Sequence, residues 1–276
     1  MTTATSPASR AVSANGLRLH VLDWGNARAT PLLLLHGLGG CAADWQRVAA
    51  HFADGYHVLA LDQRGHGDSD RAPGHYSTPD AVADLEAVVD ELALERFVLC
   101  GHSMGGMNTI AYTARHPERV LCALANDIPP ALHREREAGD AATPPPAHPV
   151  YATRADAIAA AAATRPTTPP WAIELLVDAR LGPAAGGGLT ARHDPEASAR
   201  WVFDDLWDEA RTITRPIFFI RGGRSPVLSA ETLMEMDMAI APARSITLEQ
   251  AGHATFLDME PEWLAAAEAF FAAHVR

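Results

Sequence analysis

The chain has 276 residues, 48% of them hydrophobic, and this length fits one large α/β domain with one insertion better than two independent domains. All 22 basic residues are arginine, which excludes a lysine Schiff base, a GxxxxGK(S/T) phosphate loop and the Tyr-x-x-x-Lys pair of short-chain dehydrogenases. The formal charge of -12 is spread along the chain and repels polyanions, which argues against nucleic acid as a partner.

Strand-like and helix-like segments alternate over the first 127 residues. Apolar or alternating runs predict strands at 17–23, 31–35, 56–61, 96–100 and 120–125. Helical spacing or glycine-led starts predict helices at 43–53, 79–94 and 104–115. This alternation predicts a mostly parallel sheet covered by helices on both faces.

The segment 128–210 has a different composition. Eleven of the 20 prolines lie between Pro129 and Pro195, among alanine-rich helical stretches at 155–164 and 171–181, and no strand-like run occurs there. We expect a helical cap at 128–210, inserted between two parts of the core domain, 1–127 and 211–276. Pro-rich and Gly-rich stretches at 141–149 and 183–188 predict the joints of a movable lid.

The sheet pattern resumes after the insertion, with strands predicted at 216–220 and 245–248 and helices at 230–239 and 261–273. The three cysteines, Cys41, Cys100 and Cys122, form no CxxC pair, so neither a zinc site nor a redox site is expected. The N-terminal residues do not resemble a signal peptide, and no apolar stretch is long enough to span a membrane. We therefore expect a cytoplasmic protein without membrane contact; the sequence does not indicate its oligomeric state.

Glycines after the strand at 31–35 admit a cofactor hypothesis. Gly37, Gly39 and Ala42 match G-x-G-x-x-A, and Asp62 follows 23 residues after Gly39, where a ribose-binding acid would stand. A strand already precedes this one, His36 interrupts the lead-in, and the lysine of a short-chain reductase is absent. We therefore expect no dinucleotide, no other cofactor and no metal.

The segment Gly101-His102-Ser103-Met104-Gly105 carries the strongest chemical signal. A G-x-S-x-G sequence directly after an apolar strand and before a helix is the nucleophile elbow. The serine requires a strained turn, and side chains at Gly101 or Gly105 would collide with nearby backbone. Ser103 is therefore the candidate nucleophile.

A serine nucleophile needs a base and an orienting acid. His253, in a loop after the last predicted strand, stands where the order nucleophile, acid, base places the histidine. His66, His75, His116 and His193 are expected to be solvated instead. For the acid we favour Asp127, at the end of the strand that follows the serine's helix; Asp204, Asp205 and Asp208 in the insertion are the alternatives.

Backbone N–H groups are needed to stabilise the oxyanion. Met104 follows the serine at the helix start, and Leu38 lies in the glycine-rich loop after the strand at 31–35. We predict that these two N–H groups form the oxyanion hole. Trp45, His102 and Trp171 are candidate substrate contacts, while Trp201, Phe203 and Trp207 could line a pocket or fill the cap's own core.

Four motifs in order, HGLGG at 36–40, DQRGHGDSD at 62–70, GHSMGG at 101–106 and AGH at 251–253, resemble the α/β-hydrolase superfamily, and in particular its small bacterial members with a helical cap. The resemblance implies an eight-stranded, mostly parallel sheet, a cap over the nucleophile, no cofactor, and a structural role for Asp62, Arg64 and Gly67. Such proteins commonly carry the acid in the stretch that is 221–228 here, which holds none. Haloalkane dehalogenases carry it after the strand that follows the nucleophile, but they and epoxide hydrolases use an aspartate where this chain has Ser103.

Three functions remain open at this level. The first is a serine hydrolase of a small, apolar carboxylic ester or lactone, in which Ser103, His253 and Asp127 act as nucleophile, base and acid. The second is a C–C bond hydrolase or a cofactor-free lyase or cyclase, because GHSMGG resembles the elbow of ring-cleavage-product hydrolases, although these usually have asparagine at the position of His102. The third is a binding module without catalysis.

Overall fold

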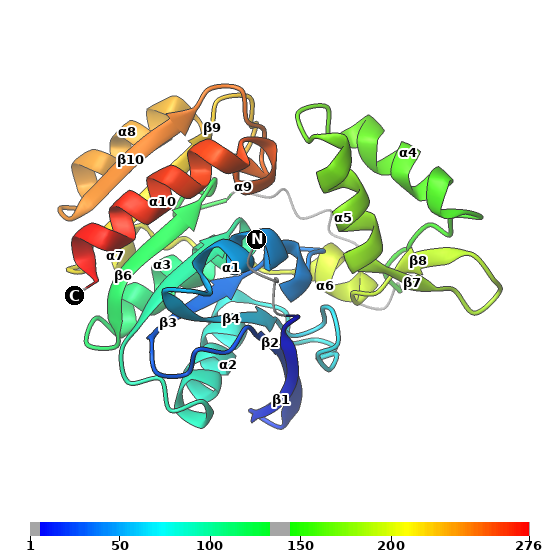
Figure 1. Cartoon of the computed structure of the whole chain (residues 1–276), viewed down its shortest axis with the longest axis horizontal. Coiled ribbons are helices and arrows are strands. Elements are labelled where there is room, and N and C mark those ends of the chain that lie inside the picture. Colours follow the sequence, from blue (N-terminus) through cyan, green and yellow to red (C-terminus); the bar gives the residue numbers. More distant parts are fainter. Residues whose placement is uncertain (1–5, 133–143, 276) are drawn as a thin grey trace.

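Eight strands form the main sheet, in the order β1-β2-β4-β3-β5-β6-β9-β10 (Figure 1). The computed structural model describes residues 6–132 and 144–275. The strands are β1 (Ala8–Ala14), β2 (Leu17–Asp23), β3 (Thr30–Leu35), β4 (Tyr56–Asp62), β5 (Phe97–His102), β6 (Val120–Asn126), β9 (Ile217–Gly222) and β10 (Ala243–Leu248). Strands β1 and β2 pair antiparallel, β2 runs antiparallel to β4, and the remaining pairs are parallel. The predicted fold class is confirmed.

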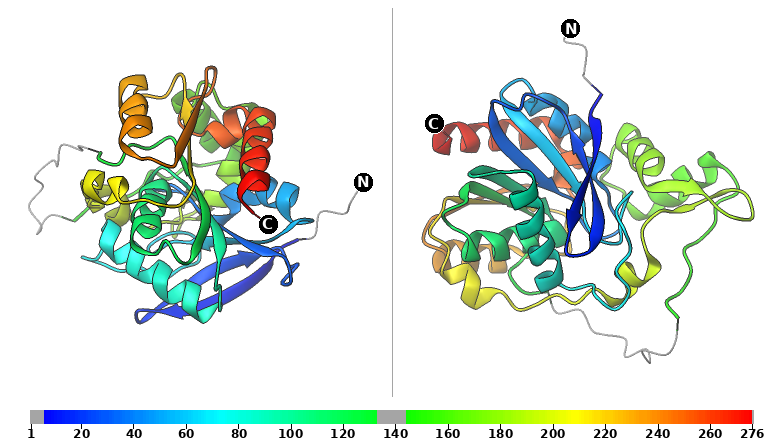
Figure 2. Two further views of the ribbon diagram at one scale, coloured as in Figure 1. Left: turned by 90° about the vertical axis from the view of Figure 1, so that its left-hand side faces the viewer. Right: turned by 90° about the horizontal axis from the view of Figure 1, so that it is seen from below.

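Helices cover both faces of this sheet (Figure 2). The helices of the core are η1 (Ala42–Trp45), α1 (Gln46–Phe52), α2 (Thr78–Glu91), α3 (Met104–Arg115), α7 (Trp207–Arg211), α8 (Ala230–Ala239), α9 (Thr255–Asp258) and α10 (Glu260–His274). Side chains alternate along β3: Leu33 and Leu35 join the core beneath α2, α3 and α8, whereas Leu32 and Leu34 join the core beneath α1 and α10. This alternation follows from the two-residue period of a strand that is buried on both sides.

The inserted segment lies to one side of the sheet (Figure 1). It contains α4 (Arg154–Thr164), α5 (Pro170–Arg180), a hairpin of β7 (Leu181–Pro183) and β8 (Leu189–Ala191), and α6 (Pro195–Arg200). Helix α7, whose first four residues fall in the range predicted for the cap, packs against α3 instead: Leu206 and Ala210 are buried in the main core. The division into core and cap remains a prediction.

Three local predictions are wrong. Strand β1 has no strand signal in the sequence because five of its seven residues are exposed at the edge of the sheet. Strands β7 and β8 have only three residues each, too few to show a period. The stretch 183–188 closes their hairpin, where Gly187 N–H donates to Ala184 O, so it is not a joint between cap and core. Of the other predicted joint, residues 141–143 lie outside the described residues.

Candidate active site

Ser103 sits on a sharp turn between β5 and α3. Its backbone angles, φ 53° and ψ -119°, lie in a region that non-glycine residues rarely adopt. A Cβ at Gly101 would lie 2.1 Å from Gly105 O, and a Cβ at Gly105 would lie 2.4 Å from Leu35 O. Only glycine therefore permits this turn, which holds Ser103 at the N-terminus of α3.

Asp127 and His253 form a direct contact. His253 Nδ1 lies 2.6 Å from Asp127 Oδ2, the Asp127 side chain is fully buried, and about a third of the His253 side chain is exposed. With Nδ1 bonded to the carboxylate, Nε2 is the ring nitrogen left for a proton from the nucleophile. No hydrogen bond joins the side chains of Ser103 and His253 within the described residues, and such bonds often tighten only when substrate binds.

Asp127 is held by the strand beside its own. It follows β6 with a positive φ of 51°, its N–H donates to Ile220 O, and its Oδ1 accepts the N–H of Gly222. The Ser225 hydroxyl donates to Oδ2, the oxygen that also faces His253. Ser225 lies in the stretch where the resemblance to α/β hydrolases leads one to expect the acid, and here its hydroxyl supports a carboxylate that follows β6.

His102 packs against His253 from the elbow side. The two ring centroids are 4.6 Å apart, and His102 Nε2 lies 3.0 Å from the carbonyl oxygen of His253. Burial, reinforced by the neighbouring His253, lowers the pKa of His102 well below its usual range. A neutral His102 donates to that carbonyl without repelling a positive charge that forms on His253.

The two predicted oxyanion donors come from separate segments, Leu38 from the loop after β3 and Met104 from the elbow. Met104 is the first residue of α3, where N–H groups have no intrahelical acceptor. Within the described residues, the N–H of Leu38 has no acceptor either, whereas its neighbour Gly39 donates to His66 Nε2 at 3.0 Å. His66 is fully buried, so the prediction that it is solvated is wrong.

A cavity of about 450 Å³ unites these groups. Its wall contains Ser103, His102, His253 and Leu38, together with residues of the insertion between Thr164 and Arg180. Arg180 reaches from the end of α5 to the core, where its guanidinium forms two hydrogen bonds with Asp44, of 2.9 and 2.8 Å. This ion pair, which no local sequence signal indicates, connects the insertion to η1, the short helix that follows the loop carrying Leu38.

The large aromatic candidates lie elsewhere. Trp45 is fully buried and stacks on Phe256 at 4.2 Å between centroids, so its assignment as a substrate contact is wrong. Trp171 is on the surface, with the Arg47 guanidinium 4.5 Å above its ring, and it does not line the cavity. The remaining aromatic candidates pack against the cores: Trp201, Phe203 and Trp207. Of the three predicted substrate contacts, only His102 borders the cavity.

The alternative acids do not reach His253. Asp208 is almost wholly exposed and pairs with Arg211, and Asp205 accepts the N–H of Trp207. Asp204 shows no contact with His253 among the described residues. Asp127 is therefore the carboxylate that the tertiary structure places against the histidine.

Asp62 has a structural role. Its buried carboxylate accepts hydrogen bonds from the N–H groups of Ala42 and Asp68 and contacts His20 Nδ1, so it is not free to bind a ribose. Of the described residues, His20, Asp62 and Asp68 alone come close enough together to hold a metal ion, but these contacts already occupy Asp62 and His20. Neither a dinucleotide site nor a metal centre follows from this loop.

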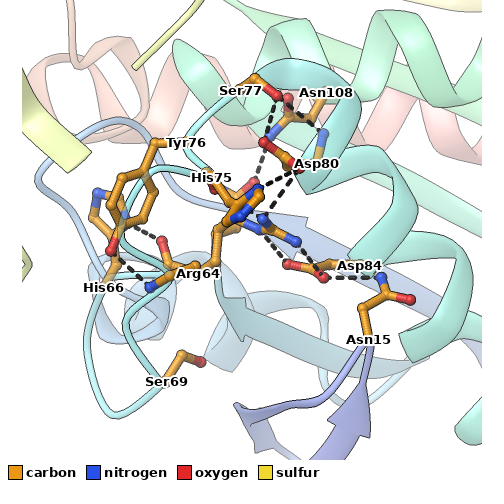
Figure 3. Close-up of polar contacts among 12 residues, drawn as sticks. Asn15, Arg64, His66, Ser69, His75, Tyr76, Ser77, Asp80, Asp84 and Asn108 are labelled. Atoms are coloured by element: carbon orange, nitrogen blue, oxygen red, sulfur yellow. Dashed lines mark hydrogen bonds and ion pairs between the residues drawn. The ribbon is translucent and has the colours of Figure 1, made fainter. Parts of the chain in front are cut away.

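The same loop is anchored by Arg64 (Figure 3). Its guanidinium forms two hydrogen bonds with Asp84, of 2.6 and 2.7 Å, and a third with His75 O, while Asn15 donates to Asp84 Oδ1. Both partners of this ion pair are buried. Arg64 thus fixes the loop that presents His66 to Gly39.

Comparisons with known proteins agree with this architecture. Residues 30–175 match the profile of the α/β hydrolase fold. The 2-(acetamidomethylene)succinate hydrolase of Mesorhizobium japonicum is 30% identical over 230 residues, 82% of this chain and 81% of the relative. A crystal structure of E-2-(acetamidomethylene)succinate hydrolase superposes with a TM-score of 0.85 at 26% identity, over 96% of this chain and 99% of that one.

A third relative matches only part of the chain. The 2-hydroxy-6-oxononadienedioate/2-hydroxy-6-oxononatrienedioate hydrolase of Klebsiella pneumoniae is 38% identical over 109 residues, 38% of each chain.

A nucleophile elbow over a parallel sheet, beside a histidine and a carboxylate, defines the class of α/β-fold hydrolases. The chain belongs to the α/β-hydrolase family, and this supports its assignment as a hydrolase. Among the described residues, no helix combines the length and the apolar character needed to cross a bilayer.

Proposed function

We propose that the chain is a serine hydrolase that cleaves a carboxylic ester or lactone through an acyl-enzyme. The observation that carries this proposal is the 2.6 Å contact of His253 Nδ1 with Asp127, in a cavity that also exposes Ser103. A serine hydroxyl is protonated at neutral pH and needs such a base. The carboxylate orients the imidazole and stabilises its charged form.

The reaction proceeds in two halves. Ser103 Oγ attacks the carbonyl carbon, His253 Nε2 takes the hydroxyl proton, and the N–H groups of Leu38 and Met104 stabilise the oxyanion. The C–O bond of the substrate breaks, and the leaving alkoxide takes the proton from His253. A water molecule then attacks the acyl-enzyme with His253 as base, which releases the acid and restores Ser103.

Labelling and turnover test this assignment. The wild-type protein is expected to react with a fluorophosphonate probe and to hydrolyse 4-nitrophenyl esters, and Ser103→Ala is expected to abolish both because the nucleophile is gone. Circular dichroism confirms that the variant is folded. Ester turnover retained by Ser103→Ala would overturn the proposal.

C–C bond hydrolysis is the second candidate. It is favoured by the GHSMGG elbow and by the partial match to a 2-hydroxy-6-oxononadienedioate hydrolase. The same serine, histidine and aspartate would serve it. Mass spectrometry of the products from a panel of esters, lactones and diketones distinguishes the two: only a C–C hydrolase separates the two carbon fragments of a diketone.

A further inference from the structure

The cavity that contains Ser103 is lined by three arginines, in a chain whose formal charge is -12. Arg165 follows α4, Arg180 ends α5, and Arg224 lies in the loop after β9. Their guanidinium groups come from the insertion and from the core, so the cavity brings together cations that are far apart in sequence. The three arginines differ in whether a carboxylate of the same chain forms an ion pair with them.

Arg180 has its own counter-ion. Its two hydrogen bonds to Asp44 form a bidentate pair, and Asp44 is almost fully buried. Burial opposes the charge of Arg180, but Asp44 outweighs this effect and raises its pKa. Arg180 is therefore satisfied without a ligand.

Arg165 and Arg224 form no such ion pair within the described residues. Arg165 is half-buried, and its guanidinium meets only neutral acceptors, the carbonyl of Ala161 at 3.5 Å and the hydroxyl of Thr164 at 3.1 Å. Burial and the nearby Arg180 lower its pKa, and the more weakly acting carboxylates of Asp44 and Asp258, which form no ion pair with it, only partly offset this effect. Arg224 is exposed to solvent and donates to the neutral amide oxygen of Gln250. Within the described residues, neither arginine pairs with a carboxylate.

One carboxylate, that of Asp258, lines the cavity, and its oxygens accept hydrogen bonds from groups other than the arginines. Asp258 Oδ2 accepts the hydroxyl of Thr167 and the N–H of Gly252, both at 2.7 Å, and Oδ1 accepts the hydroxyl of Thr168 at 2.6 Å. These bonds hold the loop after Arg165 to the loop that carries His253. Asp258 thus supports the position of Arg165 without forming an ion pair with it.

The half-buried guanidinium of Arg165 is costly without an ion pair, and a planar carboxylate matches the donors of both Arg165 and the exposed Arg224. Resting on the function proposed above, we propose that the substrate carries a carboxylate in addition to the bond that is cleaved, and that Arg165 and Arg224 bind this carboxylate. The substrate class is then a dicarboxylic acid with one carboxyl group esterified, or the corresponding lactone acid.

Binding to the Ser103→Ala variant tests the anion site without any chemistry. Calorimetry with succinate is expected to show binding that weakens with added salt, and uncharged succinamide is expected to bind poorly. Arg165→Gln and Arg224→Gln, each combined with Ser103→Ala, are expected to weaken succinate binding by about tenfold or more, and Arg165→Lys by less. Arg71→Gln removes the same charge from an exposed position outside the cavity and is expected to change nothing.

Several results would overturn the proposal: no succinate binding at tens of millimolar, equal binding of succinamide, or unchanged affinity in both cavity variants. Turnover by the wild-type protein forms the second arm, with mono-4-nitrophenyl succinate compared with 4-nitrophenyl butyrate. If succinate binds through the two arginines but no ester is cleaved, the anion site stands and the serine-hydrolase function fails. If neutral esters are cleaved and succinate does not bind, the hydrolase stands and the anion site is wrong.

Discussion

Asp127 Oδ2 and His253 Nδ1 lie 2.6 Å apart although 126 positions separate the two residues in the chain. Strand β6 delivers the aspartate, and the loop after β10 delivers the histidine, while β9 between these strands supplies Gly222 and Ser225 as hydrogen-bond donors to the carboxylate. The carboxyl ends of neighbouring parallel strands thus assemble the pair. This relationship predicts how the acid contributes to turnover.

Asp127→Asn is expected to lower kcat by about 10⁴, because an amide neither stabilises the imidazolium nor selects the required tautomer. Ester turnover and thermal unfolding, measured side by side, separate catalysis from stability. Asp208→Asn is the control: it removes an exposed carboxylate that the sequence offered as an alternative acid. This variant is expected to leave kcat unchanged. Near-normal turnover in Asp127→Asn would refute the assignment.

Gly101→Ala is expected to prevent folding or to reduce the free energy of unfolding by several kcal/mol, because its Cβ would lie 2.1 Å from the carbonyl oxygen of Gly105. Urea unfolding and soluble yield measure the effect. Gly186→Ala is the matched control, since a Cβ at that position meets no atom within 4 Å. Equal stability of the two variants would show that the elbow is less crowded than described.

Asp84→Asn is expected to reduce the free energy of unfolding by about 3 kcal/mol, because the buried Arg64 guanidinium loses its bidentate partner and keeps only the longer ion pair with Asp80, at 3.5 Å. Chemical denaturation provides the value. Asp178→Asn breaks the pair with Arg154 on the surface, where solvent screens both charges, and is expected to have little effect. A similar loss of stability in Asp84→Asn and Asp178→Asn would contradict the prediction that the buried ion pair matters more than the exposed one.

Acid is expected to destabilise the fold through two histidines, the fully buried His66 and the partly buried His193. Burial lowers the pKa of His66 well below its ordinary value and that of His193 to about 4. Both return to about 6.5 in the unfolded chain, which then binds protons that the folded chain does not. The free energy of unfolding should therefore fall as the pH decreases from about 6.5 toward about 4.

Urea unfolding at a series of pH values measures this slope. Protonation of His66 would also remove the acceptor for the N–H of Gly39, which adds to the cost. His193→Gln is expected to make the slope shallower, because one histidine that charges only on unfolding is gone. A slope unchanged in this variant, or stability that rises toward acid, would contradict the prediction.

The elbow could be predicted from the sequence because its causes are local. Strand, Ser103 and helix are contiguous, and Gly101 and Gly105 are required by contacts within the turn or with the next strand. Most of the sheet could be predicted for a related reason: strands buried on both faces are continuous apolar runs. The exposed edge strand β1 lacks such a run and gave no signal.

What the sequence determined by itself was the α/β alternation, the candidate nucleophile Ser103 and a short set of candidate partners for it. Only the tertiary structure decided among those partners, because the side chains that meet are set by strand order: Asp127 reached His253, while the cap aspartates did not. The sequence could not place Trp45, because an apolar ring is equally suited to a core or a pocket wall. The tertiary structure places it in the core. Arg165 and Arg224 have no sequence signal at all, because a shared cavity exists only once the insertion packs over the sheet.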